Sequence, residues 1–431
     1  MPSPDSRSLE ALKQQAIVDF SRHVSSAKAC FWQQLEMDVV MGRREGPFFW
    51  DLDGKKRYWN LHCNGGVYNL GHRHPQIIRE LELALRDLDM GNGHLISKAR
   101  ADLGRRLAEL MPGDLDYVVF GVSGGEAVDL SIKVARAFTG RAGIISALGG
   151  YHGHTGLALA AGDRKYREPF GPSCPGFRQV PFNDINAMEA AVDVETAAVI
   201  LETVPATLGI PVPSTDYFSA VGRICHERGA LLIMDEVQTG FGRTGKLWGF
   251  EHFDVLPDMV VLAKGMSGGI YPITATVLRK PLESVFHADP HIHVSTGGGS
   301  ELGCRVALKV LELSSAPDFL DHVNRLSEYF RTGIEKLAGR YEVLRGLRQL
   351  GLFMGLEMAD EFCGQLMCKA AFDNGLFMVY ANNRKSVVQF LPPLIITVDQ
   401  ADEIMEGLDR ALKLTGELRD FFGPAGGSHE A

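Results

Sequence analysis

Two glycines lie where a short apolar run gives way to a helical pattern, an arrangement that can bind a phosphate group. Ser123-Gly124-Gly125 follows the run Tyr117–Val122 and leads directly into an amphipathic stretch. The backbone N–H groups and the positive dipole end at such a helix start suit an anion. Strand-Gly-Gly-helix turns are also common without a ligand, so this segment alone leaves both interpretations open.

A carboxylate and a lysine end two further apolar runs. Asp235 follows Ala230–Met234, and burying a carboxylate at the end of an apolar strand is costly unless it has a partner. Lys264 follows Met259–Ala263, and a partly desolvated lysine can act as a Schiff-base nucleophile. Taken singly, Asp235 could equally cap the next turn, and Lys264 could extend its ammonium into solvent.

Together, and in this chain order, the three segments match what pyridoxal phosphate (PLP) requires. The glycine turn anchors the phosphate, the lysine forms a Schiff base, and the carboxylate keeps the pyridine nitrogen protonated so that the ring withdraws electrons. Tyr151, in the segment YHGHT just after the run Gly143–Ala147, offers an aromatic face to the ring, although a simple turn is the alternative. The sequence therefore predicts a PLP site.

The pattern of short apolar runs indicates how these residues are positioned. Between residues 70 and 329, β-branched runs alternate with amphipathic stretches, and the runs are Tyr117–Val122, Gly143–Ala147, Ala197–Glu202, Ala230–Asp235, Asp258–Ala263 and Pro272–Leu278. This alternation is typical of a mostly parallel sheet covered by helices on both faces, which binds ligands beyond the carboxyl ends of its strands. We predict a large α/β domain over residues 70–329 and a smaller α+β domain over residues 330–431. Residues 1–69, with a hairpin at Asp53-Gly54, contribute to the smaller domain.

Composition excludes several other classes of protein. The 431 residues carry a net charge of −9. An acidic chain of this kind does not attract nucleic-acid phosphates, so sequence-independent nucleic-acid binding is excluded. The apolar runs are far shorter than the ~20 residues that span a bilayer, and the N-terminus has no secretory apolar region. The seven cysteines form no CxxC pair, and there is no HExxH motif. We therefore expect a cytoplasmic protein without a metal site.

The chain resembles the class III aminotransferases, which are PLP enzymes of fold type I, in the segments SGGEAVDLSIKVAR, YHGHT, LLIMDEVQTGFGRTGKLWGFEH and PDMVVLAKGMSGG. The similarity extends from about Tyr58 to FLPPLIIT near the C-terminus. It implies a homodimer with active sites at the subunit interface, to which residues 1–69 contribute. It also implies a ping-pong transfer of an amino group to a 2-oxo acid. A PLP-dependent racemase, epimerase or aminomutase on the same scaffold is the alternative, because such relatives keep the same cofactor residues.

The resemblance also implies a role for individual residues. Lys264 is the Schiff-base lysine and general acid/base, and Asp235 is the partner of the pyridinium nitrogen. Gln238 bonds the ring hydroxyl, and Thr296 reaches the phosphate of the neighbouring subunit. The remaining cofactor-binding residues that it implies are Ser123, Gly124, Gly125, Tyr151, His152, Glu202 and Val237, with Tyr151 stacked on the ring.

The sequence departs from the family pattern where an α-amino acid would be recognised. Gln389 stands where relatives usually carry an arginine, three residues before Pro-Pro-Leu, and Thr207 replaces the glutamate that pairs with it. Because the arginine and the glutamate are both absent, neither charge is left buried without its partner. We therefore expect an amine or ω-amino donor, with pyruvate or 2-oxoglutarate as acceptor. Arg384, expected on a loop, is a candidate for the acceptor carboxylate or simply a solvated arginine, and Trp59 is a candidate pocket wall.

Overall fold

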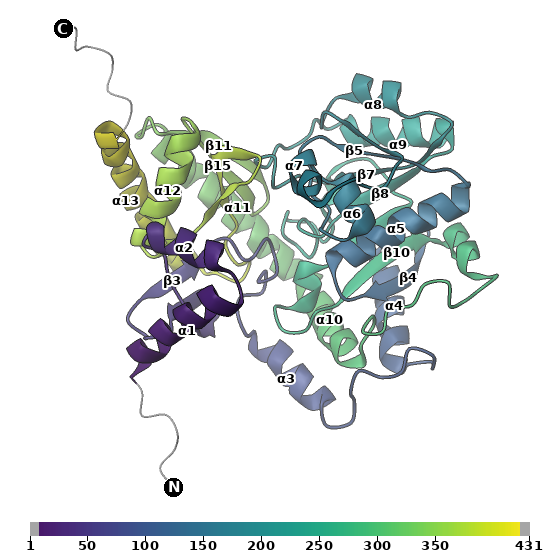
Figure 1. Cartoon of the computed structure of the whole chain (residues 1–431), viewed down its shortest axis with the longest axis horizontal. Helices are drawn as coiled ribbons and strands as arrows, with labels where there is room; N and C mark the ends of the chain where they lie inside the picture. Colours follow the sequence, from purple (N-terminus) through teal and green to yellow (C-terminus); the bar gives the residue numbers. More distant parts are fainter. Residues whose placement is uncertain (1–7, 423–431) are drawn as a thin grey trace.

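The computed structural model describes residues 8–422, which form two lobes (Figure 1). The larger lobe contains a seven-stranded sheet in the order β4-β10-β9-β8-β7-β5-β6. Its strands are β4 (Leu115–Gly121), β5 (Gly143–Ala147), β6 (Phe177–Val180), β7 (Thr196–Glu202), β8 (Leu231–Asp235), β9 (Met259–Leu262) and β10 (Thr274–Arg279). All neighbouring strands are parallel except β10, which is antiparallel to both β4 and β9. The predicted mostly parallel sheet is confirmed.

Both faces of this sheet are buried because its central strands are apolar between their end residues. Ile200 and Ile233 belong to one hydrophobic cluster, whereas their neighbours Val199 and Leu232 belong to a second cluster on the opposite face. This alternation follows from the period of two in a strand. The helices of this lobe are α3 (Pro75–Ala84), α4 (Lys98–Leu110), α5 (Gly124–Thr139), α6 (Gly156–Ala161), α7 (Arg164–Arg167), α8 (Ile185–Ala191), α9 (Tyr217–Arg228) and α10 (Glu301–Ser314).

The smaller lobe is built on an antiparallel sheet in the order β11-β12-β15-β14. Its elements are α11 (Pro317–Ala338), β11 (Leu344–Leu350), β12 (Phe353–Met358), α12 (Glu361–Asp373), β14 (Val379–Ala381), β15 (Arg384–Phe390) and α13 (Val398–Phe422). Helix α11 runs continuously across residues 329 and 330, where we placed a domain boundary.

The N-terminal segment joins this smaller lobe. It comprises α1 (Leu9–His23), α2 (Ser26–Gln34), β1 (Met41–Glu45), β2 (Phe48–Asp51) and β3 (Arg57–Asn60). Strands β2 and β3 form the hairpin predicted at Asp53-Gly54. Strand β3 also pairs in parallel with β13 (Leu376–Phe377), which brings the two ends of the chain into one sheet.

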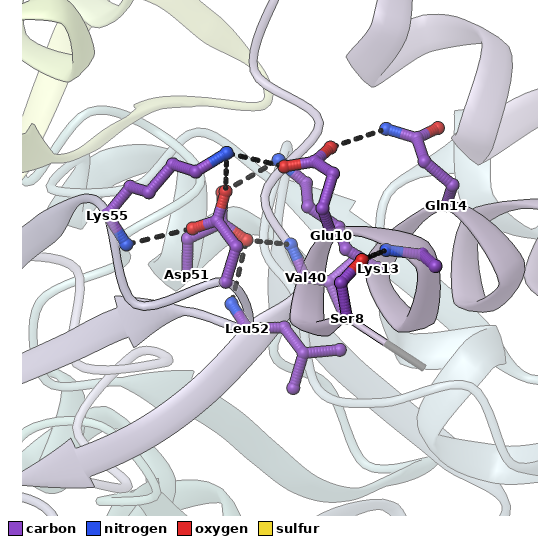
Figure 2. A network of polar contacts seen from close by, with 10 residues as sticks. Ser8, Glu10, Lys13, Gln14, Val40, Asp51, Leu52 and Lys55 are labelled. Carbon is purple, nitrogen blue, oxygen red and sulfur yellow. Dashed lines mark hydrogen bonds and ion pairs between the residues drawn. The ribbon is translucent and has the colours of Figure 1, made fainter. Parts of the chain in front are cut away.

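Polar contacts attach α1 to the hairpin (Figure 2). This helix has no buried residue. Lys13 Nζ lies 2.8 Å from a carboxylate oxygen of Asp51, which is only 4% exposed and also accepts the backbone N–H of Leu52 at 2.8 Å. Lys55 Nζ donates to Glu10 at 2.6 Å. Ion pairs therefore help to hold α1 against the hairpin.

Arg243 connects the two lobes from a fully buried position. Its guanidinium donates to the carbonyl oxygens of Leu352 (3.1 Å) and Pro392 (2.7 Å) in the smaller lobe, and to Asn69 Oδ1 (2.7 Å). Three parts of the chain that are distant in sequence thus meet at one side chain.

No helix within residues 8–422 is long and apolar enough to cross a membrane. In the same range, no group of three or more His, Cys, Asp or Glu side chains is arranged to hold a metal ion.

Candidate active site

A cavity of about 400 Å³ lies at the carboxyl ends of β8 and β9, beside the start of α5. Its walls bring together the three segments that the sequence singled out. The predicted residues that line it are Ser123, Gly124, Gly125, Tyr151, His152, Glu202, Asp235, Val237, Gln238 and Lys264. This is the edge of the sheet at which parallel α/β folds bind their ligands.

Asp235 is held in one orientation by two hydrogen bonds. One carboxylate oxygen lies 2.8 Å from His152 Nδ1, and the other accepts the backbone N–H of Val237 at 3.1 Å. Burial lowers the pKa of His152, but the hydrogen bond and charge of Asp235 raise it by more, so the net shift is upward. Both carboxylate oxygens of Asp235 are thus held against donors at the cavity wall, where a protonated ring nitrogen would need an acceptor.

Glu202 ends the neighbouring strand β7 and supports the aromatic wall. Its carboxylate accepts the backbone N–H of Tyr151 at 2.9 Å. Burial raises the pKa of Glu202 to about 7, with a further upward contribution from Asp235. Near neutral pH, Glu202 is therefore protonated in a fraction of the molecules. In that fraction, it places no second negative charge beside Asp235.

Lys264 sits in a strained backbone conformation at the start of the short 3₁₀ turn η3 (Lys264–Ser267), with φ of +41°. Such outliers cost about 1–3 kcal/mol and persist where the surrounding structure holds them. Burial lowers the pKa of Lys264 to about 8, although Asp235 and Glu202 oppose this shift. Its amine therefore loses its proton far more readily than an ordinary lysine does.

The loop at Gly65 and the amide of Gln238 hold the Lys264 ammonium in place. A Cβ at residue 65 would stand 3.0 Å from Lys264 Nζ, and the φ of +66° there also favours glycine. With its amide oriented so that both groups have partners, Gln238 accepts from Lys264 Nζ at 3.2 Å and donates to the carbonyl oxygen of Gly65 at 3.3 Å.

The predicted turn Ser123-Gly124-Gly125 lies at the start of α5. Ser123 Oγ caps the helix by accepting the N–H of Glu126 at 3.2 Å. The N–H groups of Gly124 and Gly125 belong to the first turn and have no acceptor inside the helix. A Cβ at residue 125 would lie 2.8 Å from Thr155 Oγ1, so only glycine leaves this approach open.

These features fit PLP. In the part of the chain that the structure describes, His152 Nε2 and Thr274 Oγ1 are buried at the cavity wall without a hydrogen-bond partner. They are therefore available to a bound group. The helix start suits its phosphate and Asp235 suits its ring nitrogen, while Lys264 is the one amine among the described residues that line the cavity.

Four other predicted site residues lie outside this cavity. Trp59 packs on Phe48 in the smaller lobe, with ring centroids 4.2 Å apart, so it is a core residue there rather than a wall of this cavity. Gln389 is buried on β15 and lines a different cavity, described below. Thr296 is exposed in the single chain.

The prediction that Arg384 lies on a loop is wrong. It is the first residue of β15, and its guanidinium lies 3.2 Å from a carboxylate oxygen of Glu357 on β12. The turn before it is only two residues long, because β14 ends at Ala381 and pairs directly with β15. Arg384 is therefore already paired and is not among the residues that line the cavity at Lys264.

Sequence reasoning missed Glu236, which is fully buried directly beside Asp235. Its carboxylate accepts hydrogen bonds from the hydroxyls of Thr203 and Thr239 and from the backbone N–H groups of Gly249 (2.7 Å) and Phe250 (2.8 Å). The sequence signal was the second acidic residue in DEVQTG, but its partners are 33 residues upstream and 14 downstream. Glu236 thus fixes the loop that carries Val237 and Gln238.

We expect Glu236→Gln to destabilise the holoenzyme by about 1–3 kcal/mol, because the new amide would leave at least one buried backbone N–H without an acceptor. Chemical denaturation followed by intrinsic fluorescence measures this loss. The exposed Glu195→Gln is the matched control and should change stability by less than about 0.5 kcal/mol. Equal unfolding midpoints for Glu236→Gln and the unmodified protein would contradict the assignment.

Comparisons with known proteins agree with this geometry. The family model for class III aminotransferases matches residues 32–412. The chain is 54% identical over 408 residues to an uncharacterized aminotransferase of Archaeoglobus fulgidus, covering 95% of this chain and 96% of that protein. It is 34% identical over 438 residues to a putrescine aminotransferase of Pectobacterium atrosepticum, covering 97% and 92%.

A solved structure shares the fold. The ornithine aminotransferase of Toxoplasma gondii superposes with a TM-score of 0.84 at 26% identity, covering 96% of this chain and all of that one. Each of these relatives is named as an aminotransferase, which favours transamination over the racemase, epimerase and aminomutase alternatives. The chain belongs to the class III aminotransferases and is a PLP-dependent transaminase.

Proposed function

We propose that this aminotransferase takes its amino group from an amine or ω-amino compound with no carboxylate on the reacting carbon. The observation that carries the proposal is the neutral pair at Gln389 and Thr207. Thr207 is buried and donates to the carbonyl oxygen of Gly149 at 3.0 Å, and Gln389 is 8% exposed. Neither side chain offers the cationic fork that grips a carboxylate in two places. The acceptor we propose is a 2-oxo acid such as pyruvate or 2-oxoglutarate.

The proposed roles of the site residues follow from their positions. When bound, PLP supplies an aldehyde for the amino group and a ring that withdraws electrons from the reacting carbon. Gly124 and Gly125 bind its phosphate through their N–H groups, and Ser123 keeps that helix start in place. Asp235, oriented by His152, holds the proton on the ring nitrogen.

Lys264 is the proposed proton carrier. With a pKa of about 8, its amine can take a proton from the substrate carbon and return it at a pH near neutrality. Tyr151 and Val237 line the cavity and exclude water from the ring, and Glu202 fixes the backbone of Tyr151. Gln238 keeps Lys264 Nζ directed into the cavity and bonds the ring hydroxyl when the cofactor is bound.

We further propose that the enzyme works as a cytoplasmic homodimer. Thr296 is exposed in the single chain, which leaves it accessible to a second copy, where it would reach the phosphate. Residues 1–69 would contribute to the same interface. A reducing compartment is supported by the cysteines, all seven of which are free.

A panel of donors tests the proposed function. Holoenzyme is given short primary amines, ω-amino acids and α-amino acids such as leucine, each with pyruvate or 2-oxoglutarate, and the alanine or glutamate formed is measured. We expect kcat/KM for the best amine to exceed that for the best α-amino acid by about 10- to 100-fold, the value of a lost charge-assisted hydrogen bond of about 1.5–3 kcal/mol. A preference for α-amino acids would overturn the proposal.

A further inference from the structure

A second cavity of about 370 Å³ lies between helix α2 and the smaller lobe. Phe31 and Trp32 of α2 form one wall, and Tyr380 and Gln389 of the antiparallel sheet form the other. Phe31 is 44% exposed even though large aromatic side chains are usually covered. The N-terminal segment therefore presents an aromatic surface toward Gln389, the residue that departs from the family pattern.

His62 links this cavity to the catalytic lysine. Its side chain lines the second cavity, and its carbonyl oxygen accepts the N–H of Gly65 at 2.9 Å in a tight turn. Gly65 is the residue that lies against Lys264 Nζ. Burial, together with the charge of Lys264, lowers the pKa of His62 to about 4, so the imidazole is neutral at physiological pH. One turn of chain thus separates the second cavity from the reacting amine.

The walls of the second cavity lack a counter-charge for an ion. Among the described residues that line it there is no carboxylate, and its one cationic side chain is Lys369. Lys369 Nζ is already bound by Asp373 at 2.6 Å. A second ammonium or a carboxylate placed here would lose its hydration without gaining a partner, whereas an alkyl chain or an aromatic ring would gain from burial.

We propose that this cavity receives the distal part of the amino donor, and that this part is uncharged and apolar, an alkyl or aryl chain. The inference rests on the proposed function, because it assumes that an amine is the donor. Helix α2 is then a wall of the substrate site. The Lys13–Asp51 ion pair, which anchors the adjoining helix α1, keeps that wall in position (Figure 2).

The experiment compares three donors with pyruvate: 4-phenylbutylamine, 1,5-diaminopentane and propylamine, which is too short to fill the second cavity. In the unmodified holoenzyme we expect kcat/KM to be highest for 4-phenylbutylamine. Trp32→Ala removes an aromatic side chain from the wall of the second cavity. It should lower the ratio of kcat/KM for 4-phenylbutylamine to that for propylamine by at least about 10-fold, which corresponds to a loss of about 1.4 kcal/mol. Phe421→Ala, which removes an aromatic that is 80% exposed at the end of α13, is the matched control and should leave this ratio unchanged.

Gln389→Glu tests the charge argument with a side chain of almost the same shape. The new carboxylate should raise the ratio of kcat/KM for 1,5-diaminopentane to that for 4-phenylbutylamine by at least about 10-fold, since it supplies the missing partner for the second ammonium. The absorbance of bound PLP checks that each variant is folded.

Two sets of results would overturn the inference, and they are distinguishable. If the amines react but both ratios stay constant in the variants, or if the unmodified enzyme prefers the diamine, the second cavity does not hold an apolar tail and the proposed function still stands. If no amine reacts while α-amino acids do, the proposed function fails and the inference fails with it.

Discussion

Replacing Lys264 with alanine is expected to lower kcat by about 10⁴-fold or more and to remove the visible absorbance band of covalently bound PLP. The loss combines a nucleophile and a general acid/base, the second of which alone is worth about 10²–10⁴-fold. No other lysine lines the cavity in the part of the chain that the structure describes. Gln238 and the loop at Gly65 are shaped around this one amine, so a neighbouring side chain has no route to replace it.

Absorbance spectra and steady-state turnover of the purified variant with added PLP measure both effects. Lys280→Ala is the matched control, because this lysine follows β10 and is exposed. The control should keep the band and full turnover. An Lys264→Ala enzyme that retains either the band or normal turnover would remove Lys264 from the mechanism.

The second large effect is expected for Asp235→Asn. Asparagine is neutral, so it cannot hold a proton on the ring nitrogen, and we expect kcat to fall by about 10²–10³-fold, as when one preorganised electrostatic group is removed. The visible band should persist, because Lys264 is unchanged. This separation of turnover from cofactor binding distinguishes Asp235 from Lys264.

The measurement is kcat at saturating PLP and donor, with spectra recorded in parallel. Asp216→Asn serves as the control, since Asp216 is exposed before α9 and its side chain makes no capping hydrogen bond. It should leave kcat unchanged. Full turnover in Asp235→Asn would show that the ring proton does not need this carboxylate.

Much of this arrangement is predictable from the sequence, because the apolar runs of the larger lobe form the strands that their residue pattern indicates. The apolar runs before Asp235 and Lys264 are β8 and β9, and the order of the strands brings both residues to one edge. The hairpin at Asp53-Gly54 follows from its turn chemistry. Strand β6 was missed, because Phe177–Val180 is a short, partly exposed edge strand without a continuous apolar pattern.

The features that sequence reasoning did not predict depend on contacts between distant segments. In the sequence, nothing distinguishes Glu236 from an exposed acidic residue. Its burial depends on hydrogen bonds from Thr203 and from the backbone of Gly249 and Phe250. A tryptophan such as Trp59 can line a pocket or fill a core, and the sequence does not distinguish the two. Its packing on Phe48 places it in the core. The cavity beside α2 is likewise made by the N-terminal and C-terminal parts of the chain meeting through β3 and β13.

The buried guanidinium of Arg243 has a consequence for motion during turnover. Separating the lobes would break its hydrogen bonds to Leu352 and Pro392, each worth about 1.5–3 kcal/mol because the donor is charged. Fewer than about one molecule in a hundred would be open at any moment. The open form is therefore rare at equilibrium, and Arg243 makes one structural unit of two lobes that each have a hydrophobic core of their own.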